Sequence, residues 1–226
     1  MTAGSGPLRV LVVDDEPAIL RFLRAGLGSQ GYVVVEASNG QSALDAMRQR
    51  RADLMVLDLG LPDMRGFAVA AEICKMVNPP SIVLMTADKR EAIVWQANRL
   101  RLAGFLWKGS EHPDRVWHAV AEALAGRCYF TAAYLVTLRR IQDNPPSFAQ
   151  SLSARELELI PLLGYGCSDE ELAHCVELSA ETIKAHRKHI MAKLDLHRSA
   201  DLIRWAVQQG FCDLTRRCGR GNCTNK

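Results

Sequence analysis

Short apolar runs, each followed directly by a polar residue, constrain the fold of this chain more than any other feature. Leu54 to Leu57 form one such run, and Asp58 follows it directly. A wholly apolar run of this length between loop residues is typical of a strand buried on both faces of a parallel sheet. Gly60, Pro62 and Gly66 then break the chain into a loop. Asp58 is therefore predicted at the carboxyl end of a buried strand, where open α/β sheets bind their ligands.

Three further apolar runs end in polar side chains in the same way. They are Leu8 to Val13 before Asp14, Asp15 and Glu16, Ser81 to Met85 before Thr86, and Gly104 to Trp107 before Lys108. Crowded carboxylates repel one another unless a cation neutralises them, and hard oxygen ligands suit Mg²⁺. A hydroxyl and an ammonium at neighbouring strand ends would donate hydrogen bonds and positive charge to a phosphoryl group. One such aspartate would most simply be a solvated strand end, but the combination favours a metal and phosphoryl site.

Helical segments alternate with these strands. The pattern predicts helices over about 17–29, 41–50, 67–77 and 90–102, a fifth after Pro113, and one more strand over 32–37. Alternating strands and helices predict a doubly wound, five-stranded parallel sheet. Residues 1–7 are small, and we expect them to form a flexible N-terminus.

The motifs V-V-D-D-E-P, M-V-L-D-L-G-L-P-D, L-M-T-A-D and G-F-L-W-K-G resemble the receiver domain of bacterial two-component response regulators, over residues 8–125. The resemblance implies a flavodoxin-like fold in which Asp58 accepts a phosphoryl group from a histidine kinase. It also implies that Mg²⁺ is held by Asp14, Asp15, Asp58 and the backbone carbonyl of Gly60, and that Thr86 and Lys108 bind the phosphoryl oxygens.

Phe105 occupies the aromatic switch position of that family. A switch role implies that Thr86 moves inward on phosphorylation and frees space for the Phe105 ring. A plain core aromatic is an equally good interpretation of Phe105, so both remain open at this point. Trp107 lies on the same face of the strand by alternation, and we expect it only to pack.

A linker is predicted over residues 126–150. Its first part, 129–140, has the pattern of a helix, whereas 141–150 breaks regular structure. Pro145 and Pro146 make this second part a semi-rigid tether. The chain therefore divides into two domains at this point.

A small all-α domain of four helices is predicted over residues 151–211. Its helix starts are Ser153 with Glu156 and Ser168 with Glu171, both at capping-box spacing, and the N-caps Ser179 and Ser199. The third helix, over 180–194, is expected to bury Ile183, Ile190 and Leu194. Its basic side chains are Lys184, Arg187, Lys188 and Lys193, with His186 and His189 beside them.

A helix, a turn and a cationic third helix match the geometry that fits the major groove of DNA. The segments L-S-A-R-E-L-E-L-I, S-D-E-E-L-A and S-A-E-T-I-K-A-H-R-K-H-I-M-A-K-L resemble the LuxR-type helix-turn-helix. Together with the receiver, this module is similar to the NarL/FixJ subfamily of transcription regulators. The resemblance implies DNA contacts from Thr182, Lys184, Ala185, His186, Lys188 and His189. The alternative for these residues is a solvated charged face.

The resemblance implies that the last helix of this module, over 200–209, pairs two copies of the protein on DNA. The resemblance gives it Leu202, Ile203, Ala206 and Val207 for that contact. Two-fold symmetry of the homodimer then implies inverted half-sites.

Some residues depart from the pattern of the LuxR-type module. Residues 151–210 carry seven cations and nine anions, a net charge of −2, so non-specific affinity for DNA should be modest. Asp169, Glu170 and Glu181 stand where neutral or basic residues are common. Pro161 should kink the first helix, because an interior proline removes a backbone hydrogen bond and costs about 3 kcal/mol. Residues 212–226 form a basic tail with Cys212, Cys218 and Cys223 but no C-x-x-C pair, which favours a flexible segment.

These features lead to one function and two alternatives. No apolar run approaches the roughly 20 residues that span a bilayer, and the N-terminus lacks the core of a signal peptide, so we expect a cytoplasmic protein without a membrane contact. The pattern favours a phosphorylation-controlled transcription regulator that is not an enzyme. A regulator whose receiver only binds partner proteins is the first alternative. A Mg²⁺-dependent phosphate hydrolase is the second, and no feature of the sequence suggests a pocket for its substrate.

Overall fold

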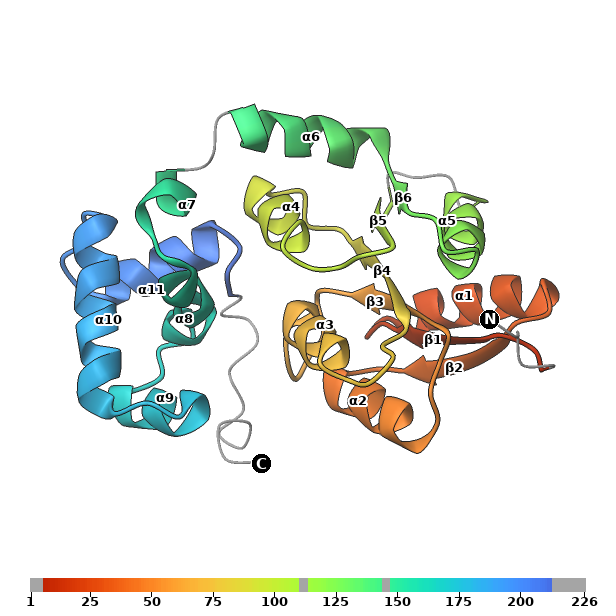
Figure 1. The fold of residues 1–226 in the computed structure, drawn as a ribbon, viewed down its shortest axis with the longest axis horizontal. Helices are drawn as coiled ribbons and strands as arrows, with labels where there is room; N and C mark the ends of the chain where they lie inside the picture. The colour runs from red at the N-terminus through yellow and green to blue at the C-terminus, as the bar shows by residue number, and fades with distance from the viewer. Residues whose placement is uncertain (1–5, 110–113, 144–146, 213–226) are drawn as a thin grey trace. The chain divides into compact units, whose positions relative to one another are not determined.

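The computed structural model describes residues 6–109, 114–143 and 147–212, which form two compact units (Figure 1). The first unit comprises Met1–Lys89 and Ile93–Leu138, and the second comprises the remainder. A flexible N-terminus was predicted over 1–7, and only its last two residues, Gly6 and Pro7, are among the described ones. Pro145, Pro146, Cys218 and Cys223 lie outside the described residues.

The first unit is built on a parallel sheet with the strand order β2-β1-β3-β4-β5-β6. Its strands are β1 (Arg9–Val13), β2 (Val33–Ala37), β3 (Leu54–Asp58), β4 (Ser81–Thr86), β5 (Gly104–Trp107) and β6 (Tyr129–Phe130). The chain passes from β1 to β2 on one side and then to β3 on the other, so the strand order reverses between β1 and β3. Ligands of open α/β sheets bind at such a reversal. Val13 pairs with Leu57, which brings the residues after them to the same crevice.

Helices cover both faces of this sheet. They are α1 (Pro17–Ser29), α2 (Gly40–Gln49), α3 (Gly66–Cys74), α4 (Glu91–Ala97), α5 (Asp114–Leu124) and α6 (Ala132–Asp143). Helices α1 and α5 lie on one face, and α2 and α3 lie on the other (Figure 1). This arrangement confirms the predicted doubly wound α/β fold.

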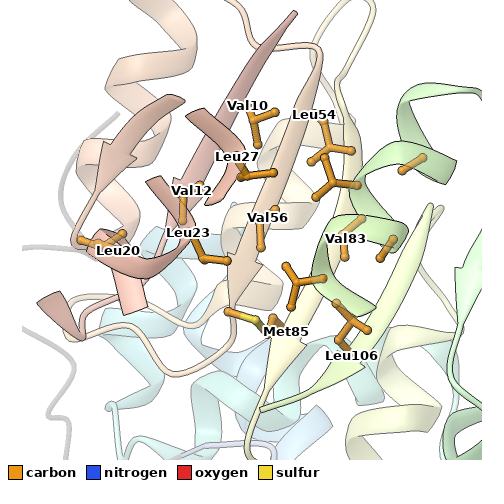
Figure 2. Packing of buried hydrophobic residues seen from close by; sticks show 14 residues of the cluster. Val10, Val12, Leu20, Leu23, Leu27, Leu54, Val56, Val83, Met85 and Leu106 are labelled. Carbon is orange, nitrogen blue, oxygen red and sulfur yellow. The ribbon is translucent and has the colours of Figure 1, made fainter. Parts of the chain in front are cut away.

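Alternate residues of the strands build the main core, which Figure 2 shows. Val10, Val12 and Val56 point to the face covered by α1, and their side chains are fully buried. The residues between them, such as Leu11 and Leu57, are buried on the opposite face. Burial on both faces explains why these strands are continuous apolar runs, and each fully buried side chain of this kind contributes about 1.5–3 kcal/mol.

The sheet has six strands, one more than the five that were predicted. Tyr129 and Phe130 were assigned to the linker helix, but they pair with Gly104 and Phe105 of β5, and α6 begins only at Ala132. Gly104 permits this approach, because a Cβ atom there would lie 2.8 Å from the carbonyl oxygen of Tyr129. A strand of two residues is too short to produce a periodic pattern, so the sequence did not indicate it.

The second unit contains α7 (Ser147–Ser151), α8 (Ala154–Gly164), α9 (Asp169–Val176), α10 (Ala180–Lys193) and α11 (Ser199–Gln208). Helix α7 lies in the stretch that was predicted to be irregular. The capping boxes of Ser153 and Ser168 are both present, and the Ser179 side chain accepts a hydrogen bond from the Thr182 N–H. The N-cap predicted at Ser199 is wrong by one residue, because Arg198 occupies the cap position and Ser199 begins the helix.

Helices α8 and α11 approach each other closely within this unit. A Cβ atom on Gly164 would lie 2.8 Å from the Ala206 Cβ and 2.4 Å from the Cys212 Sγ. Helix α8 continues through Pro161 to reach this contact. Cys212 is buried, so the first residue of the segment that was expected to be a flexible tail is packed in the core of this unit.

This packing corrects part of the predicted pairing surface. Leu202 and Ala206 are fully buried and therefore belong to the core, where a second copy cannot reach them. Ile203 and Val207 are partly exposed and remain available. None of the described helices is long and apolar enough to cross a membrane.

Candidate functional site

Three carboxylates meet at the carboxyl ends of β1 and β3. Asp14 follows β1 directly and is fully buried, and Asp58 is the last residue of β3 and is 5% exposed. Single oxygens of Asp14, Asp15 and Asp58 all lie within 4.8 Å of one another. The structure thus brings together the three acidic side chains that the sequence proposed as a metal site.

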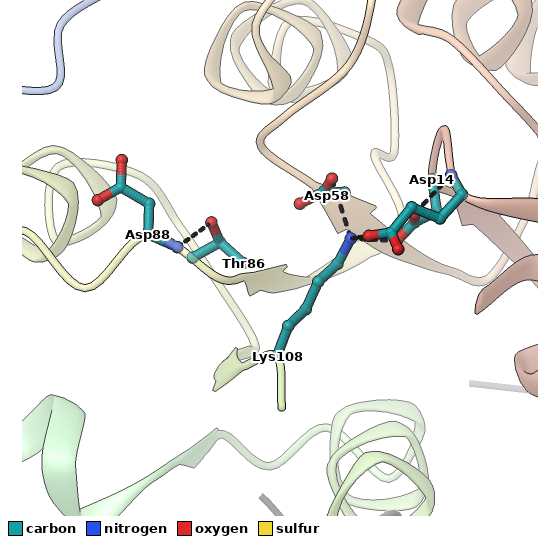
Figure 3. Close-up of polar contacts among 6 residues, drawn as sticks. Asp14, Asp58, Thr86, Asp88 and Lys108 are labelled. Atoms are coloured by element: carbon teal, nitrogen blue, oxygen red, sulfur yellow. Dashed lines mark hydrogen bonds and ion pairs between the residues drawn. The ribbon is translucent and has the colours of Figure 1, made fainter. Parts of the chain in front are cut away.

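Lys108 reaches into this group from the end of β5 (Figure 3). Its Nζ lies 2.7 Å from Asp14 Oδ2 and 3.0 Å from Asp58 Oδ2. Glu16 Oε1 lies 3.4 Å from the same nitrogen. Sequence reasoning placed Glu16 in the acidic cluster without giving it a role, although its position two residues after Asp14 was a usable signal.

The electrostatics of the site follow from burial and from this ammonium. Burial raises the pKa of Asp14 above its usual range, against the opposing effects of Lys108 and of the Glu16 N–H, which donates a hydrogen bond to Asp14. Burial alone would lower the pKa of Lys108, but contact with Asp14 and the negative charge of Asp58 outweigh it and raise that pKa. Lys108 therefore remains a cation that neutralises the carboxylates.

The donor set fits a divalent cation. Asp14 Oδ2 is buried and has no well-directed hydrogen bond, although Lys108 lies close to it. Asp15 is only partly buried, so water can reach that side of the group. Carboxylate oxygens together with water are the ligands that Mg²⁺ prefers, since it retains several of its own waters.

Thr86 is the last residue of β4, and its side chain is 3% exposed. Its Oγ1 accepts a hydrogen bond of 3.1 Å from the Asp88 N–H, as Figure 3 shows. In this bond the Thr86 hydroxyl is the acceptor, so its own O–H can still donate a hydrogen bond to another group. Sequence reasoning did not identify the Asp88 contact.

The loop after Asp58 is held in place by two features. A Cβ atom on Gly66 would lie 2.2 Å from the Asp58 carbonyl oxygen, so only glycine permits this approach. Asp63 accepts hydrogen bonds of 2.7 Å from the Gly40 N–H and from the Gln41 N–H at the start of α2. A carboxylate at a helix N-terminus is favourable, and this one joins the loop to α2.

Phe105 is fully buried on β5 and contacts two other rings. The Trp107 ring lies edge-on to it with centroids 4.7 Å apart, as expected for residues on one face of a strand. Tyr134 of α6 also lies 4.7 Å from Phe105 and stacks on Phe130 at 5.0 Å. Burial raises the pKa of Tyr134 to about 12. The sequence did not indicate that this residue, expected in a linker, covers the Phe105 ring.

Helix α10 presents most of the predicted DNA contacts to solvent. Ile183 and Ile190 are fully buried, as predicted, whereas Leu194 is only partly buried. The exposed residues on the opposite side are Thr182, Lys184, Ala185, Lys188 and His189, with His186 half-buried. Sequence spacing alone thus separated the buried side of the helix from its exposed side.

The four cations of α10 are not equivalent. Lys184 and Lys188 are exposed and make no ion pair with any residue that the structure describes. Lys193 contacts the buried carboxylate of Glu156 at 2.7 Å, and Arg187 contacts Asp169. Two of the four charges are thus paired with carboxylates of the same domain, a distinction that composition does not reveal.

Fold and site together define a two-domain signalling protein with a receiver-type acidic site and a helix-turn-helix. Residues 10–121 match the response regulator receiver domain, and residues 150–206 match the luxR family of bacterial regulatory proteins. The chain belongs to the bacterial response regulators that join these two domains, and it is a transcription regulator of the NarL/FixJ type.

Similar proteins cover nearly the whole chain. A candidate transcriptional regulator of Pseudomonas aeruginosa is 30% identical, with 88% of this chain and 96% of that protein covered. BvgA of Bordetella pertussis is 29% identical, with 86% and 94% covered. RcsB of Salmonella enterica, solved bound to a promoter with a phosphomimetic, has a TM-score of 0.65 at 23% identity, with 88% and 98% covered. At that identity, RcsB supports the fold alone.

Proposed function

We propose that phosphoryl transfer from a histidine kinase to Asp58 controls how this regulator binds DNA. The observation that carries the proposal is the position of Asp58, which is nearly buried and lies 3.0 Å from the Lys108 ammonium. A carboxylate oxygen at that place can attack phosphorus while a fixed positive charge faces the oxygens of the transferred group. Such transfers depend almost entirely on positioning and charge stabilisation.

Each neighbouring side chain has a distinct part in this transfer. Asp14, Asp15 and the backbone carbonyl of Gly60 would hold Mg²⁺ together with Asp58. The ion, when bound, neutralises negative charge on the phosphoryl oxygens and on the carboxylates. Lys108 would leave Asp14 and bind a phosphoryl oxygen, and the Thr86 hydroxyl would donate a hydrogen bond to another.

The response to phosphorylation would begin at Thr86. When the Thr86 side chain rotates to bring its hydroxyl to the phosphoryl group, its hydrogen bond with the Asp88 N–H breaks and the loop after β4 can rearrange. Phe105 lies on the neighbouring strand β5, where Leu84 of β4 is its partner in register. The change would shift the population between two states of this face, because the added charge binds one of them better.

The output would be DNA binding by α10. Lys184, Ala185 and Lys188 would face the bases, and Thr182, His186 and His189 would contact the backbone. Two copies would pair on inverted half-sites, and Ile203 and Val207 are the exposed part of α11 that can serve this contact. The protein would act in the cytoplasm and would not turn over an external substrate.

The test of the phosphorylation site is the intact mass after incubation with Mg²⁺ and acetyl phosphate. We expect one added phosphoryl group in the wild type and none in Asp58→Asn. If the folded wild type gains no phosphoryl group with Mg²⁺ present, the receiver works instead as a protein-interaction module. Turnover of a generic phosphate ester that is lost in Asp58→Asn would point to a hydrolase.

The test of the DNA-binding surface is the affinity of Lys188→Ala for a duplex that the wild type selects from a randomised pool. We expect weaker binding, since a good contact to a base edge is worth about 1–3 kcal/mol. An unchanged affinity would show that α10 is not the recognition helix.

A further inference from the structure

Arg187 is a cation of the recognition helix that is turned away from solvent. Its Nε and Nη2 donate to Asp169 Oδ1 at 2.9 and 2.7 Å, and Nη2 also donates to the Cys167 carbonyl oxygen at 3.0 Å. The side chains of Arg187 and Asp169 are 14% and 23% exposed. The neighbouring Lys188 is exposed, so adjacent charges on α10 have opposite surroundings.

The contact is stronger than an ordinary surface ion pair. A guanidinium that makes three hydrogen bonds to fixed acceptors loses little freedom per bond, because its planar fork is rigid. The pair of Arg198, the N-cap of α11, with Asp201 offers a comparison, since Arg198 is 72% exposed and the two residues are only three positions apart. Such exposed local pairs contribute little. Arg187 and Asp169, in contrast, are 18 residues apart and join two helices.

The pair lies where it can fix the angle between the two helices of the helix-turn-helix. Asp169 is the first residue of α9, and Arg187 lies in the middle of α10. The two helices are already joined at the other end of α9, where Glu177 adopts a left-handed conformation and Ser179 caps α10. A second connection at the start of α9 fixes the angle between the helices, because two separated attachments remove rotation about the turn.

We propose that Arg187 and Asp169 are a positioning pair that sets the orientation of α10 on α9 and withholds the Arg187 charge from DNA phosphates. The inference rests on the proposed binding of DNA by α10. It also gives a reason for Asp169, an acidic residue where neutral or basic ones are common in such modules. The pair raises the ratio of specific to non-specific affinity, since it aligns the residues that contact bases and contributes no phosphate contact of its own.

The salt dependence of binding separates this role from a direct phosphate contact. A residue that neutralises one phosphate contributes about 0.9 to the slope of log affinity against log salt concentration. Using the full-length chain and a duplex of mixed sequence, we expect Arg187→Gln to leave this slope unchanged. On this non-specific duplex Lys188 has no cognate base to contact and its exposed charge lies against a phosphate, so Lys188→Gln should make the slope shallower by about 0.9. Asp169→Asn should steepen the slope, because a neutral amide holds the guanidinium less tightly than a carboxylate does and Arg187 can then reach a phosphate.

Specificity is the second readout. Its measure is the affinity ratio between a duplex selected by the wild type and a shuffled duplex of the same composition. We expect Arg187→Gln to lower this ratio about tenfold, which corresponds to a loss of one unit in the logarithm of the affinity for the selected duplex. The matched control is Arg198→Gln, which breaks an exposed pair of the same chemistry and should leave both readouts unchanged.

The outcomes distinguish failure of this inference from failure of the proposed function. If Arg187→Gln makes the slope as shallow as Lys188→Gln does, Arg187 contacts phosphate and the positioning role is overturned. An unchanged affinity ratio in Arg187→Gln would overturn it as well. Should Arg187→Gln fail to fold, Asp169→Asn carries the test, because it removes the carboxylate charge while an acceptor oxygen remains to support the fold. An unchanged salt dependence in Asp169→Asn would then overturn the inference. A wild type that binds neither duplex would overturn the proposed function instead.

Discussion

Replacement of Tyr134 by alanine should destabilise the receiver unit, although sequence patterns place this residue in a linker. Its side chain is 2% exposed and packs against Phe105 and Phe130 with ring centroids 4.7 and 5.0 Å away. Tyr134→Ala would therefore leave a cavity beside β5 and uncover the Phe105 ring.

The magnitude follows from burial and from the ring contacts. Truncation of a buried aromatic side chain to alanine costs about 3–5 kcal/mol. Each ring pair contributes about 0.5–1.5 kcal/mol beyond the buried area. We expect Tyr134→Ala to lower the free energy of unfolding by about 3–5 kcal/mol, and Tyr134→Phe to lower it by less than about 1.5 kcal/mol because the ring remains.

The assay is urea unfolding followed by tryptophan fluorescence in a Trp205→Phe background. The remaining tryptophans, Trp95, Trp107 and Trp117, all lie in the first unit, so the signal reports this unit alone. Leu135→Ala is the control on the same helix. Its side chain is 44% exposed, and its truncation should change the free energy of unfolding by no more than about 0.5 kcal/mol.

A decrease of less than about 1 kcal/mol in the free energy of unfolding of Tyr134→Ala would refute the reasoning, because removal of a buried aromatic side chain costs more than that. A midpoint that shifts equally in Tyr134→Ala and Leu135→Ala would refute it too. In either case α6 would not be packed on the sheet of the receiver.

Three further predictions concern the site and the second unit. Burial raises the pKa of Glu156, but its contacts with Lys193 and Ser153 lower that pKa more, so the net shift is downward. The stability that the ionised Glu156 adds to the folded protein is therefore present above the pKa of the unfolded state. This stability is lost as the pH falls through the pKa of the folded state. Chemical denaturation should therefore show a smaller loss of stability in Glu156→Gln than in the wild type between about pH 6 and about pH 3. Gly66→Ala should slow phosphorylation by acetyl phosphate, measured by mass, since its Cβ would press on the Asp58 carbonyl. Lys108→Met should make the melting temperature rise more steeply with Mg²⁺, because uncompensated carboxylates bind a cation more tightly.

The site could be predicted from the sequence because each of its residues follows an apolar run. A buried parallel strand fixes where its carboxyl end lies, so Asp58 and Lys108 were placed without knowledge of their contacts. The capping boxes at Ser153 and Ser168 could also be predicted from the sequence, since the two partners of each box are only three residues apart. Local spacing and hydrophobic pattern carried these predictions.

The predictions that were wrong or incomplete concern residues whose roles depend on contacts that the local sequence pattern does not show. The N-cap at Ser199 was misplaced because Arg198, with hydrogen bonds of 2.9 and 3.0 Å to Asp201, occupies the cap position. Leu202 was assigned to a dimer surface because helical spacing does not say which partner covers an apolar side. Arg187 looked equivalent to its cationic neighbours, since no sequence pattern shows that Asp169 lies beside it.

The short strand β6 has a practical consequence for anyone who isolates the receiver. A fragment cut at residue 125, where the sequence motifs end, would lack Tyr129 and Phe130 and leave the edge of β5 unpaired. Unprotected strand edges recruit strands from other molecules. Such a fragment should aggregate, and its self-association could be mistaken for a native dimer. A fragment that continues to Leu138 keeps β6 and the first part of α6, and should remain in solution as a monomeric unit under the same conditions.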